Sequence, residues 1–211
     1  MITLHTWTTP NGRKISIMLE ELGIAYHINP VDITQDQQFT PAFLAISPNN
    51  KIPAIVDDAA KGGPLAIFES GAILTYLAEQ YGRFLDASGP GRYMALEWLN
   101  WQIGGLGPML GQLGFFAVFS KEKSALASQR YTDECERLLG VLDKRLSEAP
   151  YLAGADYSIA DIAVYPWVIA ASTLLAPVLG EKLAGKAALQ RWLKTLGERP
   201  AVRRGMALPD L

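Results

Sequence analysis

Residues 49–57 read NNKIPAIVD, a short apolar run that opens with a proline. A proline has no N–H that can form a hydrogen bond with a neighbouring strand. Pro53 is therefore predicted to be the first residue of a strand. A second apolar run, PLAIFE at 64–69, follows the segment AAKGG at 59–63. Two short apolar runs joined by a glycine-containing turn predict a β-hairpin.

The patterns on either side of this hairpin complete a small α+β domain. Two strands are predicted at 2–7 and 25–31, and helices are predicted at 13–22, 41–45 and 70–81. Gly23 and Gly82 each follow a helical pattern and are typical C-terminal caps. The order βαβ followed by ββα predicts a thioredoxin-like sandwich, because two parallel strands need a crossover and the hairpin adds antiparallel ones.

The remainder of the chain is predicted to be helical. Residues 83–92, RFLDASGPGR, have the composition of a linker, and no convincing strand follows them. We therefore expect a thioredoxin-like domain at 1–84 and an all-helical domain at 90–211.

Composition excludes several classes of function. A formal charge of −2 gives no general attraction to nucleic acid, and no uninterrupted apolar window predicts a membrane span. The two histidines lie in strand-like segments, so we expect no metal site, and no glycine-rich phosphate loop is present. The single cysteine, Cys135, cannot form an internal disulfide, which favours a reducing, cytoplasmic location.

Two motifs of the first domain carry chemistry. In a thioredoxin-like domain, a cis proline at position 53 would turn the main chain of Ile52 outward, where an extended peptide can pair with it; the alternative is an ordinary trans proline opening an edge strand. Glu69 and Ser70 begin a helix, whose free N–H groups favour a carboxylate. Together they suit an α-amino-acid head group, although plain helix capping explains the same residues.

These motifs and the linker and helices after them resemble the cytosolic glutathione transferases over essentially the whole chain. NKIPAIVD, IFESGAILTYLAE, TPNGRKISIMLEELG and WLNWQIGGLGPMLGQLGFF are similar to the Nu-class, disulfide-reductase-type branch, which is related to the yeast nitrogen-regulation prion protein. The resemblance implies that Ile52 pairs with the cysteinyl backbone of glutathione. It also implies that Glu69 and Ser70 hold the γ-glutamyl end, while Lys51 and Gln38 reach the glycyl end or nearby polar atoms.

The sulfur would then come from glutathione, because the turn TTPNGRK at 8–14 contains no thiol. Thr9 and Asn11 are the available donors to a thiolate, and the following helix aims its free N–H groups there. The alternative role of both residues is turn and cap chemistry, with Asn11 capping the helix. The branch suggests that Arg130 supplies a cation near the glycyl carboxylate from either subunit of a homodimer; a solvated surface arginine is the alternative.

In the helical domain, SIADI predicts a structural capping box in which Ser158 and Asp161 exchange hydrogen bonds, with no catalytic role. The expected function is reduction of small disulfides through a bound glutathione thiolate. The alternatives are conjugation of glutathione to electrophiles and a non-catalytic glutathione-binding module.

Overall fold

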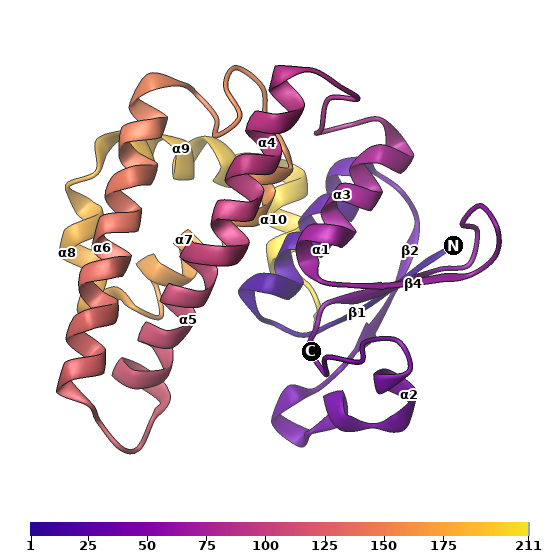
Figure 1. Cartoon of the computed structure of the whole chain (residues 1–211), viewed down its shortest axis with the longest axis horizontal. Helices are drawn as coiled ribbons and strands as arrows, with labels where there is room; N and C mark the ends of the chain where they lie inside the picture. Colours follow the sequence, from indigo (N-terminus) through magenta and orange to yellow (C-terminus); the bar gives the residue numbers. More distant parts are fainter. Residues whose placement is uncertain (211) are drawn as a thin grey trace. The chain divides into compact units, whose positions relative to one another are not determined.

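A computed structural model describes residues 1–210. The first half contains a four-stranded sheet in the order β2-β1-β3-β4 (Figure 1). β1 and β2 are parallel, whereas β3 is antiparallel to both of its neighbours. This arrangement confirms the predicted βαβ-ββα order. The strands are β1 (Ile2–Thr6), β2 (Tyr26–Pro30), β3 (Ala54–Asp57) and β4 (Leu65–Phe68).

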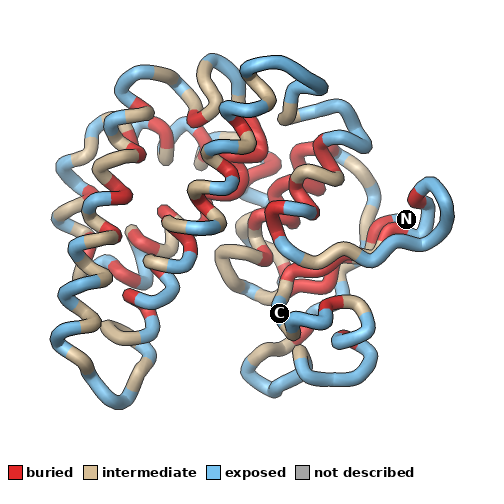
Figure 2. Tube along the Cα trace, viewed as in Figure 1, coloured by how far each residue is buried: buried red, intermediate tan, exposed pale blue. Residues whose placement is uncertain are grey.

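Helices cover both faces of this sheet. Ala54 and Ile55 are adjacent in β3, so their side chains point to opposite faces. Ala54 packs with Phe43 of α2, while α1 and α3 lie on the other face (Figure 1). Figure 2 shows buried residues along the sheet and these helices. The helices are α1 (Pro10–Leu22), α2 (Pro41–Leu44) and α3 (Ser70–Tyr81), with short 3₁₀ turns at Ile33–Gln35 and Gln37–Phe39.

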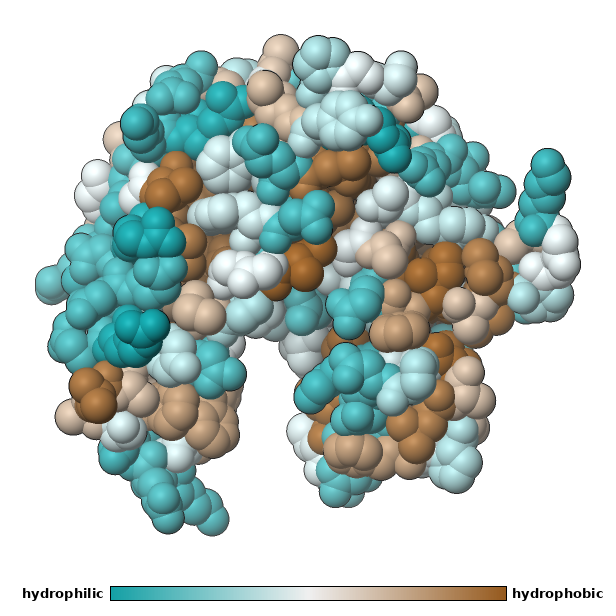
Figure 3. Space-filling view, in the orientation of Figure 1, coloured by the Kyte–Doolittle hydropathy of each residue, from teal (hydrophilic) through white to brown (hydrophobic). Residues whose placement is uncertain are grey.

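The ends of α1 and α3 follow local signals in the sequence. Gly23 and Gly82 both adopt the left-handed conformation, with φ of 68° and 63°, and they donate to carbonyls of the last helical turn. The outer strand β4 is less covered: apolar side chains gather over it in Figure 3, and Leu65 is exposed there.

The last helix, α10 (Pro200–Ala207), belongs to the first compact unit. This unit comprises Met1–Arg83 together with the segment from Glu198 onward, whereas the second unit is Phe84–Gly197. The helical region expected at 90–211 is therefore divided, because α10 packs on α1. Gly205 permits this contact, since a Cβ there would lie 2.5 Å from the main-chain N and Cα of Ile17. Arg199 also forms a two-pronged ion pair with Glu21 of α1.

The second unit is entirely helical apart from one isolated bridge between Tyr151 and Gly154. A continuous helix, Pro90–Phe119, contains two π-helical stretches, which divide α4 from α5 and end α5. By length and composition this helix, and the pair α7 and α8 bent by 112°, qualify as membrane spans. Core helices of soluble proteins share this length and apolar composition, so these features do not identify a membrane protein. The elements are α4 (Pro90–Trp101), α5 (Gly107–Gly114), α6 (Ala125–Glu148), α7 (Ile159–Ser172), α8 (Ala176–Ala184) and α9 (Ala187–Gly197), with π-helical stretches at Gln102–Leu106 and Phe115–Phe119.

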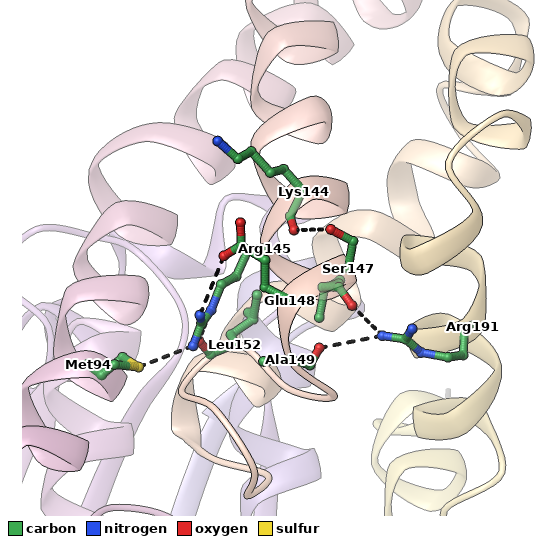
Figure 4. A network of polar contacts seen from close by, with 9 residues as sticks. Met94, Lys144, Arg145, Ser147, Glu148, Ala149, Leu152 and Arg191 are labelled. Carbon is green, nitrogen blue, oxygen red and sulfur yellow. Dashed lines mark hydrogen bonds and ion pairs between the residues drawn. The ribbon is translucent and has the colours of Figure 1, made fainter.

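Arginines hold the C-terminal end of α6 (Figure 4). Arg191 donates to the carbonyls of Leu146 and Ala149, which have no partner within the helix. Arg145 donates to the carbonyl of Leu152, 2.9 Å away, and so fixes the loop that leads to α7.

The predicted capping box begins α7. Ser158 and Asp161 exchange hydrogen bonds in both directions, as the motif requires. Asp161 is fully buried and also accepts from the N–H of Leu152 and from the indole of Trp192, at 3.1 and 2.8 Å. Burial raises the pKa of Asp161 to about 6, against the opposing effect of these donors. The box therefore joins three segments of the helical unit.

Candidate functional site

The register of the sheet brings three predicted segments to one end of it. His5 near the end of β1 pairs with Ala54 at the start of β3, and Ala54 pairs with Phe68 at the end of β4. The turn after β1, the residues before β3 and the residues after β4 must therefore emerge together. These are the segments that hold Thr9, Ile52 and Glu69.

Ile52 precedes Pro53 through a cis peptide bond. Its half-buried side chain packs against an apolar cluster below the sheet, which anchors this segment. No residue of the described chain forms a hydrogen bond with its main-chain N–H or C=O, so both groups can pair with an added extended peptide. The cluster consists of Val31, Phe43 and Ala54, with Ile46 and Phe68 beside them.

Thr9, rather than Asn11, caps α1. The Thr9 Oγ1 atom accepts from the N–H of Gly12 at 3.2 Å, and Pro10 occupies the first helical position. Asn11 is half-buried in the first turn. That turn contains no acidic residue, so the positive end of the helix dipole is not neutralised from within. The hydroxyl hydrogen of Thr9 is not used by the cap and can be donated to an anion.

Glu69 and Ser70 form the start of α3. Ser70 is the first helical residue and is 8% exposed, while the Glu69 side chain is exposed and makes no capping hydrogen bond. Glu69 has φ of 71° and ψ of 114°, a conformation that costs a non-glycine residue about 1–3 kcal/mol. Such strain persists where the surroundings enforce it, and here it places a carboxylate beside a free helix N-terminus.

The sequence reasoning missed Lys14. This lysine is 1% exposed, and its Nζ atom donates to Ser70 Oγ at 3.1 Å. Burial lowers the pKa of Lys14 to about 7, and the Glu69 carboxylate acts in the opposite direction. Lys14 therefore joins the N-terminal part of α1 to the first turn of α3.

Lys51 directly precedes Ile52, whereas Gln38 lies elsewhere in the first unit. Gln38 belongs to the 3₁₀ turn after β2, and no described residue bonds its buried Oε1 atom. Lys51 has an exposed side chain, and its carbonyl accepts from the Ser47 hydroxyl at 2.9 Å. A buried amide oxygen without a protein partner is unusual and suits a polar ligand.

Arg130 lies in the other compact unit. It is exposed on α6 and lines a groove of about 670 Å³ within that unit, together with Met109 and Arg137. Cys135, on the same helix, is fully buried, and burial raises the pKa of its thiol to about 12. Its sulfur is therefore protonated near neutral pH and unreactive.

Comparison with known proteins gives a consistent result. Residues 8–80 match the model of the glutathione S-transferase N-terminal domain, and residues 126–195 match that of the C-terminal domain. The chain is 49% identical to the disulfide-bond oxidoreductase YfcG of Escherichia coli over 99% of this chain and 94% of that protein.

Solved structures agree with this match. A Pseudomonas putida glutathione transferase with one glutathione disulfide per subunit shares 45% identity and a TM-score of 0.93, covering 99% of this chain and 91% of that one. Ure2p in complex with glutathione shares 29% identity and a TM-score of 0.88, covering 97% of this chain and 92% of that one.

Proposed function

Because the chain belongs to the glutathione S-transferase family, in the branch that contains YfcG and is structurally similar to Ure2p, we propose that it reduces small disulfides with glutathione. The observation that supports this most is the meeting of three groups at one end of the sheet: the α1 N-terminus with Thr9, the unpaired main chain of Ile52, and the α3 N-terminus with Ser70.

Each part of glutathione has a matching group in this arrangement. The cysteinyl backbone pairs with Ile52 as an added strand, which directs its sulfur to Thr9 and Asn11. Ser70 and the α3 N–H groups bind the α-carboxylate of the γ-glutamyl residue, and Glu69 binds its ammonium. Gln38 and Lys51 bind at the glycyl end, where Lys51 offers a cation.

The reaction needs no cysteine of the protein. The thiolate of bound glutathione attacks one sulfur of the substrate disulfide, which forms a mixed disulfide and releases one substrate thiolate. A second glutathione thiolate attacks the glutathione sulfur of the mixed disulfide. Glutathione disulfide forms, and the second substrate thiolate leaves and takes up a proton. The protein's contribution is to hold the first sulfur as a thiolate.

Two rates test this proposal. We expect glutathione-dependent reduction of hydroxyethyl disulfide to exceed conjugation of chlorodinitrobenzene by the same preparation. Conjugation is the second candidate, since the solved relative from Pseudomonas putida is a glutathione transferase and the same thiolate serves both reactions. The proposal is wrong if conjugation is the faster reaction.

Isothermal titration with reduced and oxidised glutathione separates an enzyme from a non-catalytic module. Binding of either form, together with turnover, supports the enzyme. Binding without turnover would identify a glutathione-binding module, and no binding at all would remove glutathione from the proposal.

We also propose that the protein is a homodimer in the cytoplasm, where reduced glutathione is maintained. Arg130 lies on an exposed helical face, close to the exposed side chain of Leu126, and such a face is suited to a second subunit. In that dimer, the Arg130 guanidinium pairs with the glycyl carboxylate of the glutathione bound to either subunit. Sedimentation equilibrium tests the oligomeric state, and a monomer would exclude a role for Arg130 in a neighbouring subunit.

A further inference from the structure

Lys14 is a buried lysine near the start of α1, and its burial requires an explanation. The side chain is 1% exposed, and it lies next to the first residue of α3. Burying a lysine is costly unless the charge gains compensating interactions. An apolar side chain of the same length would fill this space without that cost. The chemistry of the contact with Ser70 suggests what the lysine provides.

The contact fixes how Ser70 can form hydrogen bonds. A protonated lysine has three donors and no acceptor, whereas a serine hydroxyl has one hydrogen and two lone pairs. When Lys14 Nζ donates to Ser70 Oγ, at 3.1 Å, the hydroxyl accepts from it and cannot donate to it. The Ser70 hydrogen is therefore left for another acceptor, beside the free N–H groups of α3.

We propose that Lys14 is a positioning residue for glutathione: it commits the Ser70 hydroxyl to donate to the α-carboxylate of the γ-glutamyl group and places a positive charge behind that hydroxyl. This inference rests on the proposed function, because it takes the α3 N-terminus as the γ-glutamyl site. Lys14 acts through Ser70 and is not itself a catalytic residue.

The electrostatics of the site agree with this role. Burial favours the neutral amine, whereas the carboxylate of Glu69 favours the charged one. A ligand carboxylate at Ser70 would act in the same direction as Glu69. Binding of the ligand and protonation of Lys14 therefore support each other.

The test compares two ligands on one variant. Lys14→Met keeps an unbranched side chain, one atom shorter than that of lysine, and removes the donor and the charge. We expect K14M to bind reduced glutathione about 10- to 100-fold more weakly in isothermal titration, the effect of one charge-assisted hydrogen bond. The second ligand is the analogue in which γ-aminobutyryl replaces the γ-glutamyl residue, so that the α-carboxylate is missing. K14M and the wild type should bind this analogue with equal affinity.

A double variant tests whether Lys14 acts through Ser70. The affinity lost in K14M/S70A should be less than the combined losses of K14M and S70A, because either change breaks the same path. Lys61→Met is the matched control, since Lys61 is exposed in the β3–β4 turn and should leave both affinities unchanged. Thermal unfolding shows whether K14M is folded, and K14L is measured in the same way if it is not.

The outcomes separate this inference from the proposed function. If the wild type does not bind glutathione, both are overturned. If the wild type binds and K14M binds equally well, only the role of Lys14 is overturned. The role is also overturned if K14M loses the same affinity for both ligands, since the effect would then be independent of the carboxylate.

Discussion

Thr9 offers the most direct test of thiolate stabilisation, because one hydroxyl has two separable tasks. Its oxygen caps α1 by accepting from the N–H of Gly12, at 3.2 Å, and its hydrogen is the proposed donor to sulfur. Thr9→Val preserves the shape of the side chain and removes both. The lost cap should lower the free energy of unfolding by about 0.5–2 kcal/mol. The lost donor, a charge-assisted bond of about 1.5–3 kcal/mol, should raise the pKa of bound glutathione by roughly one to two units.

Two further substitutions at this position separate the tasks. Thr9→Ser retains the oxygen and the hydrogen, so both the free energy of unfolding and the thiol pKa should stay close to those of the wild type. Thr9→Asp retains a capping oxygen but provides no hydrogen at neutral pH, and its charge repels a thiolate. Its stability should therefore be preserved while the thiol pKa rises more than in T9V.

The thiolate absorbance of bound glutathione, titrated against pH, measures the thiol pKa, and urea unfolding measures stability. The reasoning is refuted if T9V unfolds more easily yet leaves the thiol pKa unchanged. Thr9 would then be a helix cap alone, and the thiolate would depend on other groups.

Three further substitutions test the frame around the site. Gly205→Ala would place a Cβ 2.5 Å from the main chain of Ile17, so α10 must shift; we expect a loss of about 1–3 kcal/mol in urea unfolding, and wild-type stability would contradict this packing. Asp161→Asn leaves the Ser158 N–H facing an amide nitrogen that cannot accept, which should cost about 1–3 kcal/mol in the same assay; an unchanged midpoint would show that the buried box has another acceptor. Cys135→Ala should leave disulfide reduction unchanged, because the buried thiol has a pKa of about 12, and a large loss of turnover would implicate the protein's own sulfur.

The sequence predicted those features that depend on neighbouring residues. Gly23 and Gly82 end their helices because glycine adopts the left-handed conformation without strain, whatever the tertiary fold. The exchange of hydrogen bonds between Ser158 and Asp161 spans one helical turn and is equally local. The hairpin after Pro53 likewise needs only two apolar runs and a turn. These elements gave the thioredoxin-like order and the family resemblance.

The features that sequence reasoning missed depend on contacts between distant segments. Lys14 follows another basic residue near the start of α1, a pattern that predicts exposure to solvent, and its contact in the folded chain is with Ser70 of another helix. α10 has the amphipathic pattern of a surface helix, but that pattern does not name its partner. The close approach of Gly205 to α1 identifies that partner. The segment from Glu198 onward is therefore assigned to the first unit.

The return of α10 to α1 has a consequence for biosynthesis. A ribosome releases the strands and helices of the first unit early, yet the helix that covers Ile17 emerges only after the whole of Phe84–Gly197 has been made. Until then, one side of α1 remains open to water and to chaperones. The first compact unit of this protein therefore reaches its finished form only after the segment inserted within it has been synthesised.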